Sequence, residues 1–114
     1  MQLGTYKLTE KKSKFLAALF KVETAQELQT TIEDFKKSHA KAAHVCYGYT
    51  LNGEEVFKND GEVGHPGRAL LDILKDKKKT NHLLIVARYY GGIKLGPGGV
   101  RRAFRDAGRA CFEE

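Results

Sequence analysis

Glycine and basic residues gather in one segment near the carboxyl end of the 114-residue chain. The segment reads Arg88-Tyr-Tyr-Gly-Gly-Ile-Lys-Leu-Gly-Pro-Gly-Gly99 and leads from a strand-like run into a helical pattern. The start of a helix leaves backbone N–H groups unpaired and carries partial positive charge, and glycines let an anion approach that backbone closely. The segment therefore indicates a phosphate cradle. The alternative is a tight connection whose glycines only supply unusual dihedral angles.

The helical pattern over residues 100–111 separates apolar from basic residues. At about 100° per residue, one face carries an apolar stripe and the opposite face carries arginines. The stripe is Val100, Ala103, Phe104, Ala107 and Cys111, and the basic residues are Arg101, Arg102, Arg105 and Arg109. Guanidinium groups make planar, multi-donor contacts to phosphate, so we expect an anionic partner here rather than an ordinary solvated face.

Two tyrosines, Tyr89 and Tyr90, lie directly before the glycines. We expect one to point into the core, and the other could stack on a base, as aromatic residues do in proteins that bind single-stranded RNA. The segment lacks the standard nucleotide-binding motifs, so it gives nucleotide hydrolysis little support. The predicted anion-binding set is Arg88, Tyr90, Gly91, Gly92, Lys94, Gly96, Gly98, Gly99, Arg101, Arg102 and Arg105.

A second group of chemically capable residues lies in the loop before a short helix. Asp60, Glu62 and His65 could form a metal site or an acid–base group. The favoured interpretation is that the carboxylates bond to loop backbone or pair with Arg68 or Arg88, so that Asp60, Glu62, His65 and Arg68 organise the loop. No nucleophile–base–orienter set can be named, and we predict no catalytic residue, metal or cofactor.

The elements that must position these residues follow from patterns along the chain. Thr24 and Glu27 form a capping box, and the apolar residues that follow predict a helix to about Ser38. Asn52-Gly53 predicts a β-hairpin turn. The predicted strands are Phe15–Val22, Val45–Leu51, Glu54–Lys58 and His82–Arg88, the last buried on both faces; the other predicted helices are Arg68–Lys77 and Val100–Cys111. The order β-α-β-β-α-β-α predicts an α+β domain with its helices on one sheet face. Lys11, Lys12 and Lys14 are expected to be a solvated lead-in to the first strand.

Bulk composition predicts one soluble domain, residues 1–114. Hydrophobic residues make up 41% of the chain and charged residues 30%, which argues against disorder. The apolar run Leu83–Ala87 is too short to span a bilayer, and Met1–Thr9 lacks a signal-peptide core, so we expect a cytoplasmic protein with no membrane partner. Cys46 and Cys111 are expected to be buried free thiols. The net charge of +6 favours anionic partners.

Four blocks of the sequence resemble the IMPACT/YigZ family, specifically its N-terminal type domain. The matching blocks are Ser13–Ala17, Ala43–Tyr49, Asp60–Glu62 and Arg88–Gly99. The resemblance implies a fold like domain 2 of ribosomal protein S5, with a four-stranded mixed sheet, helices on one face and a left-handed crossover. It also implies a link to the regulation of translation, and bacterial members are suspected of binding nucleic acid.

The loop before the short helix departs from the family pattern. Asn59–Gly67 is one residue shorter than the usual motif and lacks its first acid and its hydroxyl residues, which weighs against a carboxylate-based catalytic site. We therefore expect a module that binds RNA, or another phosphate-bearing ligand, and acts in translation. The alternatives are a regulator that binds a protein of the translation machinery and an enzyme acting on a phosphorylated small molecule.

Overall fold

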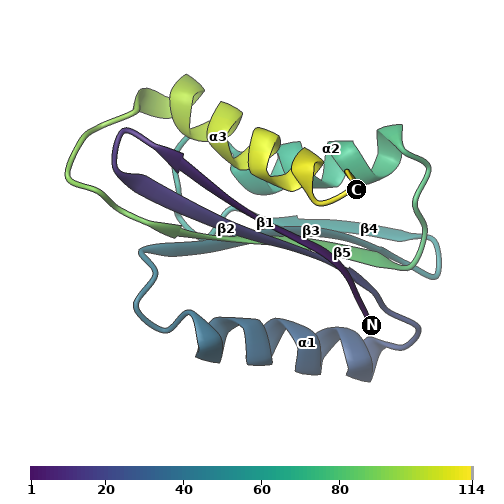
Figure 1. Cartoon of the computed structure of the whole chain (residues 1–114). Coiled ribbons are helices and arrows are strands. Elements are labelled where there is room, and N and C mark those ends of the chain that lie inside the picture. Colours follow the sequence, from purple (N-terminus) through teal and green to yellow (C-terminus); the bar gives the residue numbers. More distant parts are fainter. Residues whose placement is uncertain (114) are drawn as a thin grey trace.

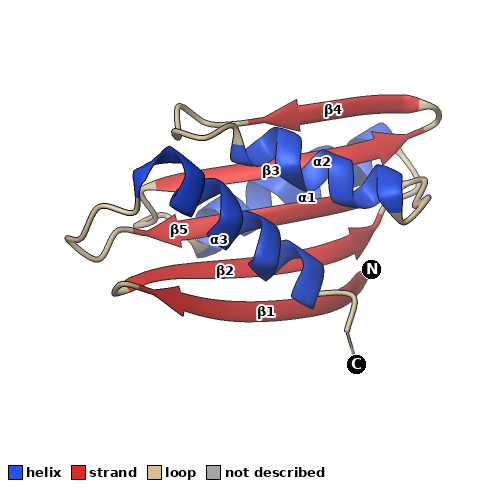
Figure 2. Cartoon of the chain, turned by 90° about the horizontal axis from the view of Figure 1, so that it is seen from above, coloured by secondary structure: helices blue, strands red, loops and turns tan. Residues whose placement is uncertain are grey.

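Five strands form one antiparallel sheet in the order β1-β2-β5-β3-β4 (Figure 2). The computed structural model describes residues 1–113. Within residues 1–113 three helices cover the sheet. Two lie on one face and one lies on the other (Figure 1). Along the chain the elements are β1 (Gln2–Glu10), β2 (Ser13–Lys21), α1 (Ala25–Ser38), β3 (His44–Leu51), β4 (Glu54–Lys58), α2 (Pro66–Asp76), β5 (His82–Tyr89) and α3 (Gly96–Ala110).

The central strand β5 contributes to a hydrophobic core on each face of the sheet. Leu84 and Val86 pack with residues of α2 and α3, while Leu83, Ile85 and Ala87 pack beneath α1. Every residue from His82 to Arg88 is buried. The prediction that this strand is buried on both faces is confirmed, because a continuous apolar run can serve two cores at once.

The expectation that all helices lie on one sheet face is wrong. Helix α1 lies on the face opposite α2 and α3 (Figure 1). Its stripe of Leu28, Ile32 and Phe35 packs on the core that includes Val45 and Ile85. Strand β2 also serves both cores, so apolar residues stand on both of its faces and its sequence shows no clear period of two.

A strand that the patterns did not predict, β1, is the fifth member of the sheet, so the prediction of a four-stranded sheet is wrong. The prediction of a mixed sheet is also wrong, because every pair of neighbouring strands is antiparallel. Strand β1 pairs with β2 in register from Thr5↔Ala18 to Glu10↔Ser13. Lys11 and Lys12, expected as a lead-in, are the hairpin turn and have φ of 46° and 68°. This strand lies at an edge of the sheet and most of its side chains are exposed, so its sequence shows no alternation of apolar and polar residues.

The hairpin and the helices otherwise follow their local signals. Asn52 and Gly53 have positive φ and join β3 to β4, which confirms the Asn-Gly turn. The Thr24 hydroxyl accepts from the Glu27 N–H at 3.0 Å, and α1 ends at Ser38 as predicted. Helix α3 begins at Gly96 rather than Val100. Within residues 1–113 no helix combines the length and apolar character needed to cross a bilayer.

Candidate functional site

Three connections meet at one end of the molecule: the β1–β2 turn, the loop over residues 59–65 and the loop over residues 90–95 (Figure 2). Gly91 lies so close to the Lys12 carbonyl that no Cβ would fit there. Gly64 lies in the same way against the carbonyl of Pro97, in the first turn of α3. The two sequence segments predicted to hold function therefore adjoin in space.

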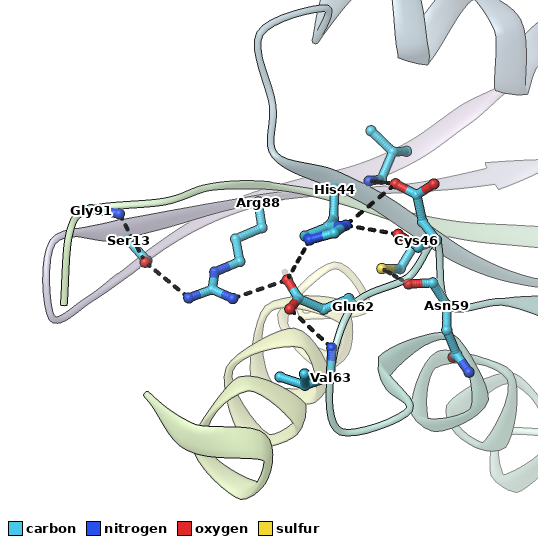
Figure 3. Close-up of polar contacts among 10 residues, drawn as sticks. Ser13, His44, Cys46, Asn59, Glu62, Val63, Arg88 and Gly91 are labelled. Atoms are coloured by element: carbon cyan, nitrogen blue, oxygen red, sulfur yellow. Dashed lines mark hydrogen bonds and ion pairs between the residues drawn. The ribbon is translucent and has the colours of Figure 1, made fainter. Parts of the chain in front are cut away.

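Arg88 is buried in this end and does not face solvent. Its guanidinium donates to Glu62 Oε2 at 2.9 Å and to Ser13 Oγ at 3.5 Å, and Ser13 Oγ also accepts from the Gly91 N–H at 3.2 Å (Figure 3). The Arg88 and Glu62 side chains are 7% and 4% exposed. The guanidinium therefore pairs with a loop carboxylate, as in the interpretation favoured for the Asp60–Glu62 loop, and it is not available to an external anion as the predicted binding set required.

The carboxylates of the 59–65 loop accept hydrogen bonds from backbone N–H groups. Asp60 Oδ2 accepts from the Val45 N–H at 2.8 Å, and Glu62 Oε1 accepts from the Val63 N–H at 3.0 Å. His44 Nδ1 lies 2.7 Å from the Asp60 carbonyl oxygen, and its Nε2 lies 3.9 Å from Glu62 Oε2 (Figure 3). Among the residues described, no group of His, Cys, Asp and Glu side chains has the geometry to hold a metal ion.

The start of α2 is organised by Asn59 more than by the predicted His65. Asn59 Oδ1 accepts from the Gly67 N–H at 2.9 Å, and its carbonyl accepts from the Cys46 thiol at 3.1 Å (Figure 3). His65 is the N-cap residue with φ of 52° but gives no side-chain cap. Arg68 pairs with Asp72 at 3.4 Å on the helix surface. Sequence reasoning missed Asn59, His44 and Ser13 as organising residues, although all three stand in or beside the family blocks.

Helix α3 starts without a capping side chain. Its N-cap is Leu95, whose apolar side chain accepts no hydrogen bond from the N–H groups of the first turn. Gly96, Gly98 and Gly99 belong to this first turn and not to the preceding loop. Gly92 and Gly96 have φ of 87° and 74°, a region that favours glycine. A Cβ at Gly98 would meet no atom within 4 Å, so the backbone there is open. This start can donate N–H groups to an anion.

Basic side chains flank this helix start on two sides. Lys94, Arg101 and Arg102 are exposed, and within residues 1–113 none has a carboxylate within 4.0 Å. Arg101 lines a hollow with His65 and Arg68, whereas Arg102 lines another with Lys11. Arg105 is half-buried, and its Nε lies 3.8 Å from Asp106. The structure brings two unpaired arginines and a lysine to one helix start but directs the two arginines to different hollows.

The two tyrosines divide between the core and the surface. Tyr89 is partly buried, and its hydroxyl lies 2.7 Å from His39 Nδ1 on the α1 side. Tyr90 is 53% exposed, and the Arg88 guanidinium lies 5.4 Å from its ring centroid. About half of the Tyr90 surface is therefore accessible to a ligand, which is a condition for the contact that was predicted for it.

A separate hollow of about 710 Å³ lies on the opposite sheet face, between α1 and the β1–β2 edge. Leu16, Phe20 and Phe35 give it apolar walls. None of the predicted site residues lines it, so its size does not bear on the anion-binding hypothesis.

Comparisons with known proteins place residues 11–112 under the family model described as the Impact N-terminal domain. The IMPACT family member YvyE of Bacillus subtilis is 35% identical over an alignment of 107 residues, and the match covers 90% of this chain and 49% of that protein. The IMPACT family member YigZ of Escherichia coli is 30% identical over 100 residues, 82% of this chain and 49% of that protein. A protein IMPACT homolog of Dictyostelium discoideum is 38% identical over 97 residues, 78% and 28% respectively. The chain thus spans about half the length of the two bacterial relatives.

Two solved structures share the fold. One, described as the crystal structure of an hypothetical protein, superposes with a TM-score of 0.91 at 26% identity and covers 97% of this chain and 57% of that one. The other, described as the two-domain translational regulator Yih1, has a TM-score of 0.60 at 20% identity and covers 96% and 45%. The second likeness shows the fold alone.

Proposed function

Since the chain belongs to the family of Impact N-terminal domains, we propose that it is a binding module that acts in the regulation of translation and holds RNA phosphates at the start of α3. The role in translation is supported by the family resemblance and by the description of the similarly folded Yih1 as a translational regulator. We place the module in the cytoplasm, with RNA or a translation-machinery protein as its partner. We also propose that the fold is like that of domain 2 of ribosomal protein S5. This fold would include a left-handed crossover from β2 through α1 to β3.

One observation carries the proposal: an uncapped helix start lies among cations that have no acidic partner within residues 1–113. The N–H groups of the first turn and the positive end of the helix dipole attract an anion. Lys94, Arg101 and Arg102 add side-chain charge that no ion pair among residues 1–113 neutralises. The phosphates of an RNA strand supply that anion repeatedly, so one strand can engage both sides of the helix.

The remaining predicted residues take narrower roles in this proposal. The open backbone of Gly96 and Gly98 contacts phosphate together with the N–H of Gly99, where a Cβ would stand 3.2 Å from Leu95 Cβ. Gly91 and Gly92 shape the loop before it. Tyr90 offers a stacking surface, and Arg105 contributes charge from the next turn. Asp60, Glu62, His65, Arg68 and the buried Arg88 hold the loops in place.

The test is the salt dependence of RNA binding. The logarithm of the affinity should fall linearly with the logarithm of the salt concentration, with a slope of about −0.7 per phosphate contacted on a single strand. Replacing Arg101, Arg102 and Arg105 together by glutamine should make the slope shallower by about 2. The matched control replaces Lys36, Lys37 and Lys41, three exposed lysines at and beyond the end of α1, and should leave the slope nearly unchanged.

Equal slopes for the wild type and the arginine triple variant would refute this placement of the site. A partner retained after nuclease treatment and at high salt would favour the protein-binding alternative. A thermal-shift response to phosphorylated small molecules, without any RNA binding, would favour an enzyme.

A further inference from the structure

We infer that the hollow between the starts of α2 and α3 accepts an unpaired RNA base, with Phe57 as the stacking surface and Arg101 as the contact to the adjoining phosphate. This inference rests on the proposed RNA-binding function. The hollow has a volume of about 330 Å³ and is lined by Phe57, His65, Arg68, Asp72 and Arg101. Phe57 belongs to none of the sequence-predicted sets.

The Phe57 ring is accessible because of its position on an edge strand. It lies on β4, at one edge of the sheet, and is 41% exposed. Its cross-strand partner on β3 is Gly48, which has no side chain to cover the ring. A Cβ at Gly48 would stand 2.5 Å from the Leu71 backbone nitrogen, so α2 packs directly against the sheet there. The ring is thus held beside α2 with part of its surface open.

Of the two arginines that line the hollow, Arg68 pairs with a carboxylate and Arg101 has none within residues 1–113. The Arg68 guanidinium lies 5.9 Å from the centroid of the Phe57 ring and covers part of one side of it. Arg68 Nε also lies 3.4 Å from Asp72 Oδ1, so this arginine already has an acidic partner. Arg101 also lines the hollow and has no acidic partner within residues 1–113. An open aromatic surface beside a guanidinium that has no acidic partner within residues 1–113 matches the base and the phosphate of one nucleotide.

The hollow is continuous with the proposed phosphate-binding surface, which makes an RNA strand the favoured ligand. Arg101 lies in the second turn of α3, and its Cβ is 3.4 Å from the place where a Cβ on Gly64 would stand. The loop that carries His65 therefore packs on the same turn that presents the basic residues. A base inside a duplex is stacked and cannot reach an aromatic ring, so the site should require a single strand.

The experiment uses two substitutions of Phe57. Phe57→Leu keeps an apolar side chain against α2 but removes the aromatic face, and it should weaken binding of single-stranded oligoadenylate RNA about tenfold. Binding of a blunt RNA duplex and the salt slope should both stay unchanged, because no charge is lost. Phe57→Trp should bind oligoadenylate as tightly as the wild type.

The same tryptophan is the reporter, because the natural chain contains none. Oligoadenylate should quench the fluorescence of the Phe57→Trp protein through stacking. The matched control is Tyr6→Trp, since Tyr6 is 45% exposed and lies on β1 at the opposite sheet edge. Its fluorescence should not change when RNA binds.

The inference is overturned if Phe57→Leu binds oligoadenylate like the wild type and the tryptophan at position 57 is not quenched; RNA binding itself would then stand. Quenching by adenosine monophosphate at equally low concentration would also overturn it, since the hollow would then be a mononucleotide site. If the wild type binds neither RNA, the proposed function fails, and this inference fails with it.

Discussion

The Arg88 guanidinium and the Glu62 carboxylate form a 2.9 Å ion pair with both side chains more than nine-tenths buried. The pair joins the end of β5 to the 59–65 loop, and Ser13 Oγ ties the same guanidinium to the start of β2. Among residues 1–113, Arg88 Nε has no hydrogen-bond partner, so the guanidinium is not fully satisfied by hydrogen bonds. Removing one partner leaves an uncompensated buried charge, which is more damaging than removing both.

Glu62→Ala should lower the free energy of unfolding by about 3 kcal/mol or more, because Arg88 would stay buried without a counter-charge. Urea unfolding followed by circular dichroism measures the change. Asp72→Ala is the control, since it removes the exposed pair with Arg68 and should cost no more than about 1 kcal/mol.

The double variant Glu62→Leu with Arg88→Met gives the sharper result. It removes both charges and should be less destabilised than the sum of its two single variants, since neither remaining group needs a buried partner. Additive effects, or a loss below about 1 kcal/mol for Glu62→Ala, would contradict a structural role for the pair.

Local signals were enough to predict the elements that have strong local chemistry. Asn52-Gly53 accepts the positive φ of a tight turn, and Thr24 with Glu27 caps α1, so both features were predictable. Strand β1 lacks such a signal, because an edge strand buries little and its turn uses Lys11 and Lys12 where Asn or Gly is usual.

Which face a helix covers depends on contacts that no local pattern encodes. The stripe on α1 shows that the helix packs on a core but not on which side of the sheet. The site has the same limit. The sequence placed Arg88 in the anion-binding set and also offered it as a partner for a loop carboxylate. No local pattern decides between these two roles, because the burial of Arg88 depends on Glu62, 26 residues away.

Gly98→Ala should separate stability from RNA binding. The position lies in the first turn of α3, its φ is not positive, and a Cβ there would meet no atom within 4 Å. The free energy of unfolding should stay the same or rise by up to about 1 kcal/mol, because alanine favours the helix. RNA affinity should fall about tenfold, the equivalent of one charge-assisted hydrogen bond, since the methyl group would displace a phosphate from the backbone.

Gly108→Ala is the control on the same helix. Its Cβ would stand 2.7 Å from Leu70 Cδ2 in the core, so this variant should lose stability, while the folded protein keeps its RNA affinity. Thermal unfolding and RNA titration together give the two readouts. Unchanged RNA affinity in Gly98→Ala would argue against a phosphate contact by this backbone.

Acidification should destabilise the fold through His39 and His82. Burial lowers the pKa of both imidazoles below the ordinary value of 6.5. The unfolded chain then takes up protons first as the pH falls, so the free energy of unfolding is highest above pH 6.5 and declines as the pH drops through the folded pKa. Urea unfolding between about pH 7.5 and pH 5.5 measures the slope.

The double variant His39→Gln with His82→Gln should show a shallower decline than the wild type. His44 and His65 are present in both proteins and do not affect the comparison. Equal slopes in the two proteins would mean that neither buried imidazole contributes to the pH dependence.

Both thiols should be unreactive in the folded protein. Cys46 and Cys111 are free and buried, and burial raises the pKa of the Cys111 thiol to about 12 and that of Cys46 further. A thiol-specific reagent at about pH 8 requires thiolate, so reaction should follow the rate of unfolding or local opening, and both thiols should react at once in denaturant.

Cys111 follows the last turn of α3 and should react before Cys46, which lies on β3 beside the central strand β5. The single variants Cys46→Ser and Cys111→Ser assign the two phases. A fast phase that is lost in Cys46→Ser would show that the start of β3 opens more easily than the end of α3. The hydrogen bond from the Cys46 thiol to the Asn59 carbonyl would then not hold the 59–65 loop in place.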